Sequence, residues 1–175
     1  VNEGGGWDTG SWQPLTYINN YLYYSHRCSD TKARERYDGV ARFFRAYFYF
    51  EKVKRFGDVP WYEVQLGSAD EALYKPRDSR ELIMTNMIKD IDEAINSGGL
   101  TEDISTYRVN KWAALALKAR FCLFEGTFRK YHTELNMTAS ANDMLKLSRD
   151  AAKAIIDKNR YSLFVHPTAK DSYWQ

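Results

Sequence analysis

Few residues of this chain have the spacing that covalent or metal-assisted chemistry requires. The sequence contains no HExxH, CxxC, GxSxG or Walker-type motif, so motifs give no indication of peptidase, thiol redox, serine hydrolase or nucleotide hydrolase activity. His26 and Cys28 are two positions apart, and on a helix that spacing directs side chains to different sides. Asp90, Asp92 and Glu93 could supply glycosidase carboxylates, but they fall on the exposed face of an expected helix. We therefore expect no enzyme, no catalytic residues, no metal and no cofactor.

The charge balance argues against nucleic acid as a partner. The chain has 25 basic and 23 acidic residues, a formal net charge of +2, which gives no strong field to attract a polyanion. Basic residues between positions 32 and 55 could contact RNA in a helical-repeat protein. However, Asp38 with Arg42 and Glu51 with Arg55 have the four-residue spacing that predicts ion pairs within one helix.

The composition is that of a chain that can bury its own core. It has 175 residues, of which 44% are hydrophobic and 15% aromatic, so neither a disulfide nor a metal is needed for folding. Cys28 and Cys122 are far apart in the sequence, which leaves open whether they pair. No apolar stretch reaches the roughly 20 residues of a membrane span. The chain as given is expected to be soluble and to be part of a longer protein.

The first third of the sequence predicts a loop followed by two helices. Residues 1–13 are rich in glycine and show no helical or alternating period, which indicates an irregular loop. Pro14 suits the first turn of a helix, and this helix is expected over residues 14–27. A second helix, apolar nearly all round at its centre, is expected over residues 31–56. Gly57 can adopt the left-handed conformation that ends such a helix.

Two further helices are predicted after a long connection over residues 61–77, where no period is sustained. Asp78 and Glu81 have the spacing of a capping box, so the third helix is expected to begin there. Asn110 is expected to cap a fourth helix that is rich in alanine, and small residues at this density allow neighbouring helices to approach closely.

The last segment predicts a fifth helix and then a loop. Ser140 and Asp143 repeat the capping-box spacing before an amphipathic pattern that ends near Asn159, and residues 160–175 are expected to be a loop. The helical core thus covers residues 14–159. Five helices in succession predict an all-α fold of helix pairs packed in the manner of tetratricopeptide-like repeats, with irregular loops.

One stretch resembles the signature region of the SusD/RagB family. It reads ARFFRAYFYF at residues 41–50 and RFGDVP at residues 55–60. Later pieces follow in the same order as in the family: PRDSRE, IKDIDEAI, RVNKWAALALKAR and AAKAII. The resemblance covers residues 12–162, which is nearly the whole chain.

The resemblance implies a binding function without chemistry. Members of that family are surface-exposed outer-membrane lipoproteins of Bacteroidetes, built on tetratricopeptide-like helix pairs. They lie over a SusC-like TonB-dependent transporter and capture oligosaccharide for import. They are longer than this chain and carry a lipidated N-terminal cysteine. By resemblance, residues 1–175 are one SusD-like helical domain fragment that binds a glycan such as a starch-like polysaccharide, with the lipid anchor outside this chain.

The resemblance also implies a site for the ligand. Aromatic faces stack on the apolar side of sugar rings, while carboxylates and amides bind the hydroxyls. In the family, the loop before the first helices can contribute such aromatics, and Trp7, Asp8 and Trp12 occupy that region here. The alternative is that both tryptophans fold back onto the helices. Trp61, with Tyr62, and Trp112 are expected to serve packing.

A second interpretation of function belongs to another class. A tetratricopeptide-like chain could be a scaffold that binds only protein, or a relative that captures peptides. A glycan-binding protein should gather its loop aromatics around a concave surface, whereas a scaffold should bury them and offer a groove between helices. The sequence leaves the identity of the glycan open.

Overall fold

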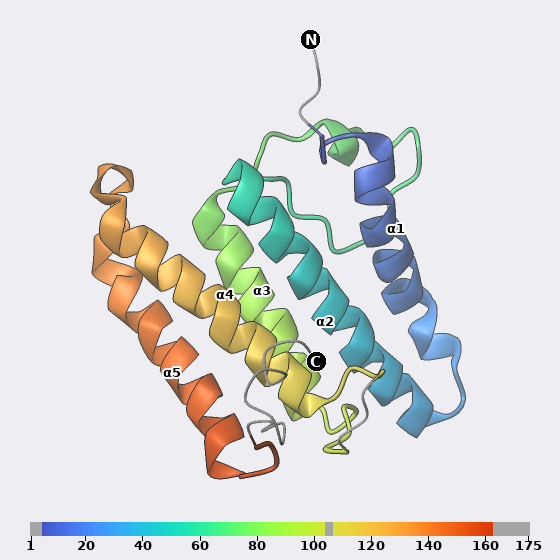
Figure 1. Cartoon of the computed structure of the whole chain (residues 1–175). Helices are drawn as coiled ribbons and strands as arrows, with labels where there is room; N and C mark the ends of the chain where they lie inside the picture. The colour runs from blue at the N-terminus through green and yellow to red at the C-terminus, as the bar shows by residue number, and fades with distance from the viewer. Residues whose placement is uncertain (1–4, 104–106, 163–175) are drawn as a thin grey trace, which may run out of the picture.

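The computed structural model describes residues 5–103 and 107–162, and within them the chain forms five α-helices and no strand (Figure 1). The helices are α1 (Thr9–Tyr24), α2 (Thr31–Phe56), α3 (Arg80–Asn96), α4 (Lys111–Tyr131) and α5 (Ala141–Asp157). Consecutive helices run in opposite directions (Figure 1). The most extensive packing joins α2 to α3 and α4 to α5, and α1 lies against α2. The predicted all-α fold of helix pairs is confirmed.

The first helix begins earlier than the sequence predicts. α1 starts at Thr9 and contains Pro14, so the prediction of a loop over residues 1–13 is wrong in its second half. Asp8 explains the difference, because its side chain accepts a hydrogen bond from the backbone N–H of Ser11 at 3.0 Å and so caps the helix. α1 also ends sooner than expected, at Tyr24, and a 3₁₀ turn over Ser25–Arg27 follows it.

The second helix has the predicted bounds, but its predicted ion pairs are wrong. Arg42 pairs with Glu93 at 2.9 Å and with Asp90 at 3.3 Å, both on α3, instead of with Asp38. Glu51 pairs with Lys54 at 2.6 Å instead of with Arg55. Gly57 ends the helix as predicted, with a positive φ of 68° that suits glycine, but its ψ of −111° lies outside the predicted left-handed helical conformation.

The predicted helix caps have mixed outcomes. Asn110 caps α4 through a 2.8 Å bond from the N–H of Ala113, as predicted. α3 is capped by Ser79, not by Asp78, and Ser140 makes no capping bond to α5. Both side chains have tertiary partners instead: Asp78 accepts from the N–H of Trp61 at 2.7 Å, and Ser140 accepts from Arg129, described below. The predicted loop over residues 160–175 lies largely outside the described residues.

The main core lies between α2, α3 and α4 and is closed by residues of the connection that follows α2. Trp61 and Trp112, which the sequence assigns to packing, are only 7% and 3% exposed, and that prediction is confirmed. Cys122 is buried in this core and Cys28 is exposed, both as free thiols. Fully buried members of the core are Ala46, Tyr49, Val59, Ile83, Met87, Ile91, Ala94, Ala114, Phe121 and Cys122.

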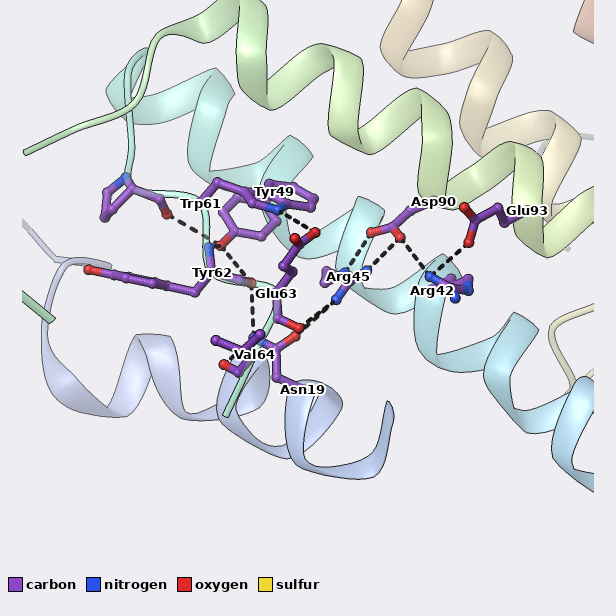
Figure 2. A network of polar contacts seen from close by, with 11 residues as sticks. Asn19, Arg42, Arg45, Tyr49, Trp61, Tyr62, Glu63, Val64, Asp90 and Glu93 are labelled. Atoms are coloured by element: carbon purple, nitrogen blue, oxygen red, sulfur yellow. Dashed lines mark hydrogen bonds and ion pairs between the residues drawn. The ribbon is translucent and has the colours of Figure 1, made fainter. Parts of the chain in front are cut away.

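A buried ion pair joins α2 to α3 and fixes the start of the connection between them (Figure 2). The Arg45 guanidinium donates two bonds of 2.6 Å to the two carboxylate oxygens of Asp90. The two residues are 5% and 2% exposed, so the expected exposure of Asp90 is wrong. Arg45 also donates to Asn19 on α1 at 3.2 Å and to the carbonyl of Glu63 at 3.4 Å. Burial alone would lower the pKa of Arg45, but the bonds and charge of Asp90 raise it.

The same network holds the chain around Tyr62. Asn19 donates to the carbonyl of Tyr62 at 2.9 Å, and the backbone N–H of Tyr62 donates to the Tyr49 hydroxyl at 2.6 Å. The Tyr49 and Trp61 rings stack with centroids 4.1 Å apart. The path of the connection next to α1 is therefore set by buried side chains of α1 and α2.

A second buried ionic cluster joins α3 to α4. Glu125 is fully buried and accepts from Arg80 at 2.8 Å and from Arg129 at 2.8 Å. Arg129 extends the cluster to Glu81 and to the hydroxyl of Ser140, each at 2.6 Å. Each buried charge in the cluster thus has an opposite charge beside it, as burial requires.

Removing the Asp90 charge should destabilise the fold strongly. In the full-length protein, Asp90→Asn should lower the free energy of unfolding by about 3 kcal/mol, because Arg45 is left as an uncompensated buried charge. Asp157→Asn is the matched control, since Asp157 forms an exposed pair with Lys153 at 2.8 Å and should change stability by less than about 1 kcal/mol. Urea unfolding measures both. Equal small losses would show that the buried pair does not hold α2 to α3.

The turn after α3 gives a second test of packing. A Cβ atom on Gly99 would meet the backbone carbonyl of Glu35 on α2. Gly99→Ala should therefore cost about 1 to 3 kcal/mol, because the turn must move away from α2. Gly67→Ala is the control: nothing lies within 4 Å of its Cβ position, and its effect should stay within about 0.5 kcal/mol. Thermal unfolding of the two variants that shows no difference would contradict this close approach.

Candidate ligand-binding site

The first half of α1 and the connection over residues 57–79 border an open cavity of about 570 Å³. Three aromatic side chains line it, namely Trp7, Trp12 and Tyr62. Trp7 and Trp12 come from the start of the chain, while Tyr62 comes from the connection after α2. The part of the cavity wall around Tyr62 is held in place by the bonds of Asn19 and Tyr49 that Figure 2 shows. The cavity thus has an aromatic lining on a fixed frame.

The two predicted tryptophans are brought together and are half-buried. Their ring centroids lie 5.3 Å apart in an edge-on contact. Trp7 also packs on Phe56 at 4.9 Å, and Trp12 on Phe48 at 5.5 Å, so both rings fold back onto α2. They nevertheless line the cavity. The two interpretations of these tryptophans, packing against the helices and exposure to a ligand, are therefore compatible in this structure.

Asp8, the third predicted site residue, has a structural role. Its Oδ1 atom caps α1, and the bond from the Ser11 N–H lowers the pKa of its carboxyl. Its neighbours Trp7 and Thr9 line the cavity, whereas Asp8 is not one of the lining residues. Only the Oδ2 atom remains for a ligand that extends over the rim.

Tyr62 packs against the main core, as the sequence predicts, and it also lines the cavity. It is half-buried, its ring lies 6.2 Å from that of Trp12, and burial raises the pKa of its hydroxyl. Its backbone serves the network, while its side chain lines the cavity. No local pattern marks such a residue, because the chain around it has neither helical nor alternating period.

The charged residues that line the cavity are Lys75 and Arg77, and both were missed by the sequence. The Lys75 ammonium donates to Asp78 at 2.6 Å and to the carbonyl of Trp61 at 2.7 Å. Burial alone would raise the pKa of Asp78, but these contacts with Lys75 and the Trp61 N–H lower it. The Arg77 guanidinium lies over the Trp7 ring, 4.8 Å from its centroid.

A second surface lies on the outer side of α1 and α2. Tyr17, Tyr37, Phe44 and Tyr47 are each more than 40% exposed there. Two shallow hollows of about 460 and 620 Å³ share Tyr17 as a lining residue. Exposed aromatic groups of this extent are typical of protein interfaces.

Three further findings concern metal binding, membrane spans and the buried thiol. Within residues 5–103 and 107–162, no three His, Cys, Asp or Glu side chains are grouped so that they could hold a metal ion. No helix among those residues is both long enough and apolar enough to cross a membrane. Burial raises the pKa of the Cys122 thiol to about 12, so this cysteine is a poor nucleophile at neutral pH.

Solved structures show the same fold. A SusD-like protein from Bacteroides fragilis matches 91% of this chain with a TM-score of 0.71 at 23% identity, and the match covers 28% of that protein. A SusD superfamily protein from the same organism matches 87% of the chain with a TM-score of 0.67 at 19% identity, over 30% of its own length.

Sequence comparisons identify the family. A SusD-like protein of Formosa agariphila is 31% identical over 108 residues, which is 61% of this chain and 21% of that relative. The chain thus spans about a fifth of the length of this curated relative. The model of the family described as starch-binding and associating with the outer membrane matches residues 3–174. The chain therefore belongs to the SusD-like family.

Proposed function

We propose that the protein binds glycan without chemistry at the cell surface and delivers it to a SusC-like TonB-dependent transporter. Membership of a starch-binding, outer-membrane-associated family supports this function. The observation that carries the proposal is the cavity lined by Trp7, Trp12 and Tyr62. Aromatic rings on a fixed frame suit the apolar face of a sugar ring. Membrane association is proposed to come from a lipid anchor outside this chain.

The proposed roles differ among the site residues. Trp12 and Tyr62 are the proposed stacking platforms, because both line the cavity, with the two rings edge-on to each other at 74°. Trp7 extends the platform towards Arg77. Thr9 and Thr16 also line the cavity, and their hydroxyls can donate to and accept from sugar hydroxyls. The proposed contact of Asp8 is through its Oδ2 atom alone.

The exposed tyrosines of α1 and α2 support a second candidate function. A tetratricopeptide-like scaffold, or a peptide-capturing relative, would bind its partner through such a surface. The two functions use different residues, since the exposed surface includes Tyr37 and Tyr47 and the cavity does not. They can therefore be separated by substitution.

Truncating Trp12 should weaken sugar binding. In the full-length protein, Trp12→Ala should raise the Kd for a bound oligosaccharide roughly five- to thirtyfold, because a stacking platform worth about 1 to 2 kcal/mol is lost. Trp7→Ala should have a smaller effect of the same sign. Calorimetry with a panel of neutral and acidic oligosaccharides measures the Kd, and thermal unfolding confirms that each variant is folded.

Tyr47→Ala provides the matched control, since it removes an exposed ring from α2 and leaves the cavity intact. Sugar binding should then be unchanged. Sugar affinity that survives both tryptophan substitutions would place the ligand site elsewhere in the protein. Failure to bind any sugar, together with peptide or transporter binding that Tyr47→Ala weakens, would replace the glycan function with the scaffold function.

A further inference from the structure

The cavity beside Trp12 has a charge bias that the glycan proposal does not use. Its charged lining residues are Lys75 and Arg77, and no Asp or Glu lines it among the residues that the structure describes. A site for neutral sugars usually has carboxylates or amides to accept hydrogen bonds from hydroxyls. The amide residues Asn19 and Gln65 also line this cavity, but its charged groups can only donate hydrogen bonds.

The two cations are not equivalent. The ammonium of Lys75 is compensated by Asp78 at 2.6 Å and is further bound to the carbonyl of Trp61. Arg77, by contrast, makes no ion pair within residues 5–103 and 107–162. A guanidinium beside the cavity that has no carboxylate partner among the described residues can take one from a ligand.

The position of Arg77 suits that role. Its neighbour Asp78 is pinned, because the Asp78 N–H donates to the carbonyl of Val59 at 3.2 Å and its carboxylate binds the N–H of Trp61. The guanidinium itself lies over the Trp7 ring. Stacking of this kind orients the planar group. The edge of a guanidinium can bind a carboxylate or a sulfate by two parallel hydrogen bonds.

We propose that Arg77 makes the cavity selective for anionic glycans, in which a sugar ring stacks on Trp12 or on Tyr62 while a carboxylate or sulfate group meets the guanidinium. This inference rests on the proposed function, because it assigns a ligand class to the same cavity. The ligand class is defined by negative charge, which uronic acids carry on a carboxylate and sulfated sugars carry on a sulfate.

Matched pairs of ligands test the inference. Each pair differs only in charge: an oligogalacturonide and its methyl ester, an alginate oligosaccharide and its methyl ester, and a carrageenan oligosaccharide and its desulfated form. Calorimetry on the full-length protein should give a Kd for at least one anionic member about three- to tenfold lower than for its neutral twin, as expected for one exposed charge-assisted contact. Raising the salt concentration should weaken only the anionic member. The pairs that show the difference tell carboxylate from sulfate.

Substitution of Arg77 tests whether this residue causes the preference. Arg77→Gln should bring the ratio of the Kd values of the two twins close to one, and this ratio is the readout because Arg77 lines the cavity. Arg77→Lys should retain part of the preference, because lysine keeps the positive charge but cannot donate two parallel hydrogen bonds as a planar guanidinium does. Arg27→Gln is the matched control: Arg27 also lies over a ring, 4.3 Å from that of Tyr24, but away from the cavity, and the preference should persist.

The outcomes separate this inference from the proposed function. Neutral and anionic twins that bind equally, or a preference that survives Arg77→Gln, would overturn the inference while glycan binding stands. Absence of binding by every member of the panel, neutral sugars included, would overturn both. A preference that Arg77→Gln and Arg27→Gln reduce equally would show a general effect of net charge, and the inference would also fail.

Discussion

The buried ion pair between Arg45 and Asp90 is the constraint on which the rest of this structure depends. Two charges that are almost fully withdrawn from water are tolerated only when they meet, so the contact determines how α3 lies along α2. The remaining donors of the guanidinium then require acceptors, and Asn19 and the carbonyl of Glu63 supply them. Through these bonds the pair also positions α1 and the chain beside Tyr62. A helix-packing requirement thus shapes the wall of the cavity.

The other end of α3 follows the same rule with different residues. Glu125 lies between Arg80 and Arg129 without exposure to solvent, and it connects the start of α3 to the end of α4. Such networks contribute little net stability compared with apolar packing, since desolvation offsets much of the attraction. Their effect is to exclude alternative alignments, because any shift of one helix would leave a charge unpaired. The apolar core between the two networks could tolerate small shifts far better.

These networks also explain which features the sequence could predict. The bounds of α2 and its end at Gly57 follow from local signals, and they were predicted correctly. Asp78 and Ser140 have the spacing of helix caps, but they bind distant groups, the Trp61 N–H and the Arg129 guanidinium. The spacing of a capping box therefore predicts the wrong partner where a distant buried donor also requires an acceptor. Tyr62 and Arg77 could not be assigned to the cavity for a related reason, since both lie on a connection without period. Asn19 and Tyr49 hold the chain at Tyr62, and the bonds of Asp78 to Val59 and Trp61 hold it beside Arg77.

The state of the tryptophans follows from what a binding platform needs. Trp12 is held by Trp7 and Phe48, and the Lys52 ammonium lies 4.7 Å from its ring centroid. Packing on one side fixes the ring before any ligand arrives, so a ligand need not offset the roughly 0.5 to 1.5 kcal/mol of ordering that a free side chain would cost. A fully exposed tryptophan would offer more area but would lose that advantage. Half-burial therefore does not argue against a ligand-binding role for Trp12, because rigid support and an open side are both requirements of a stacking site.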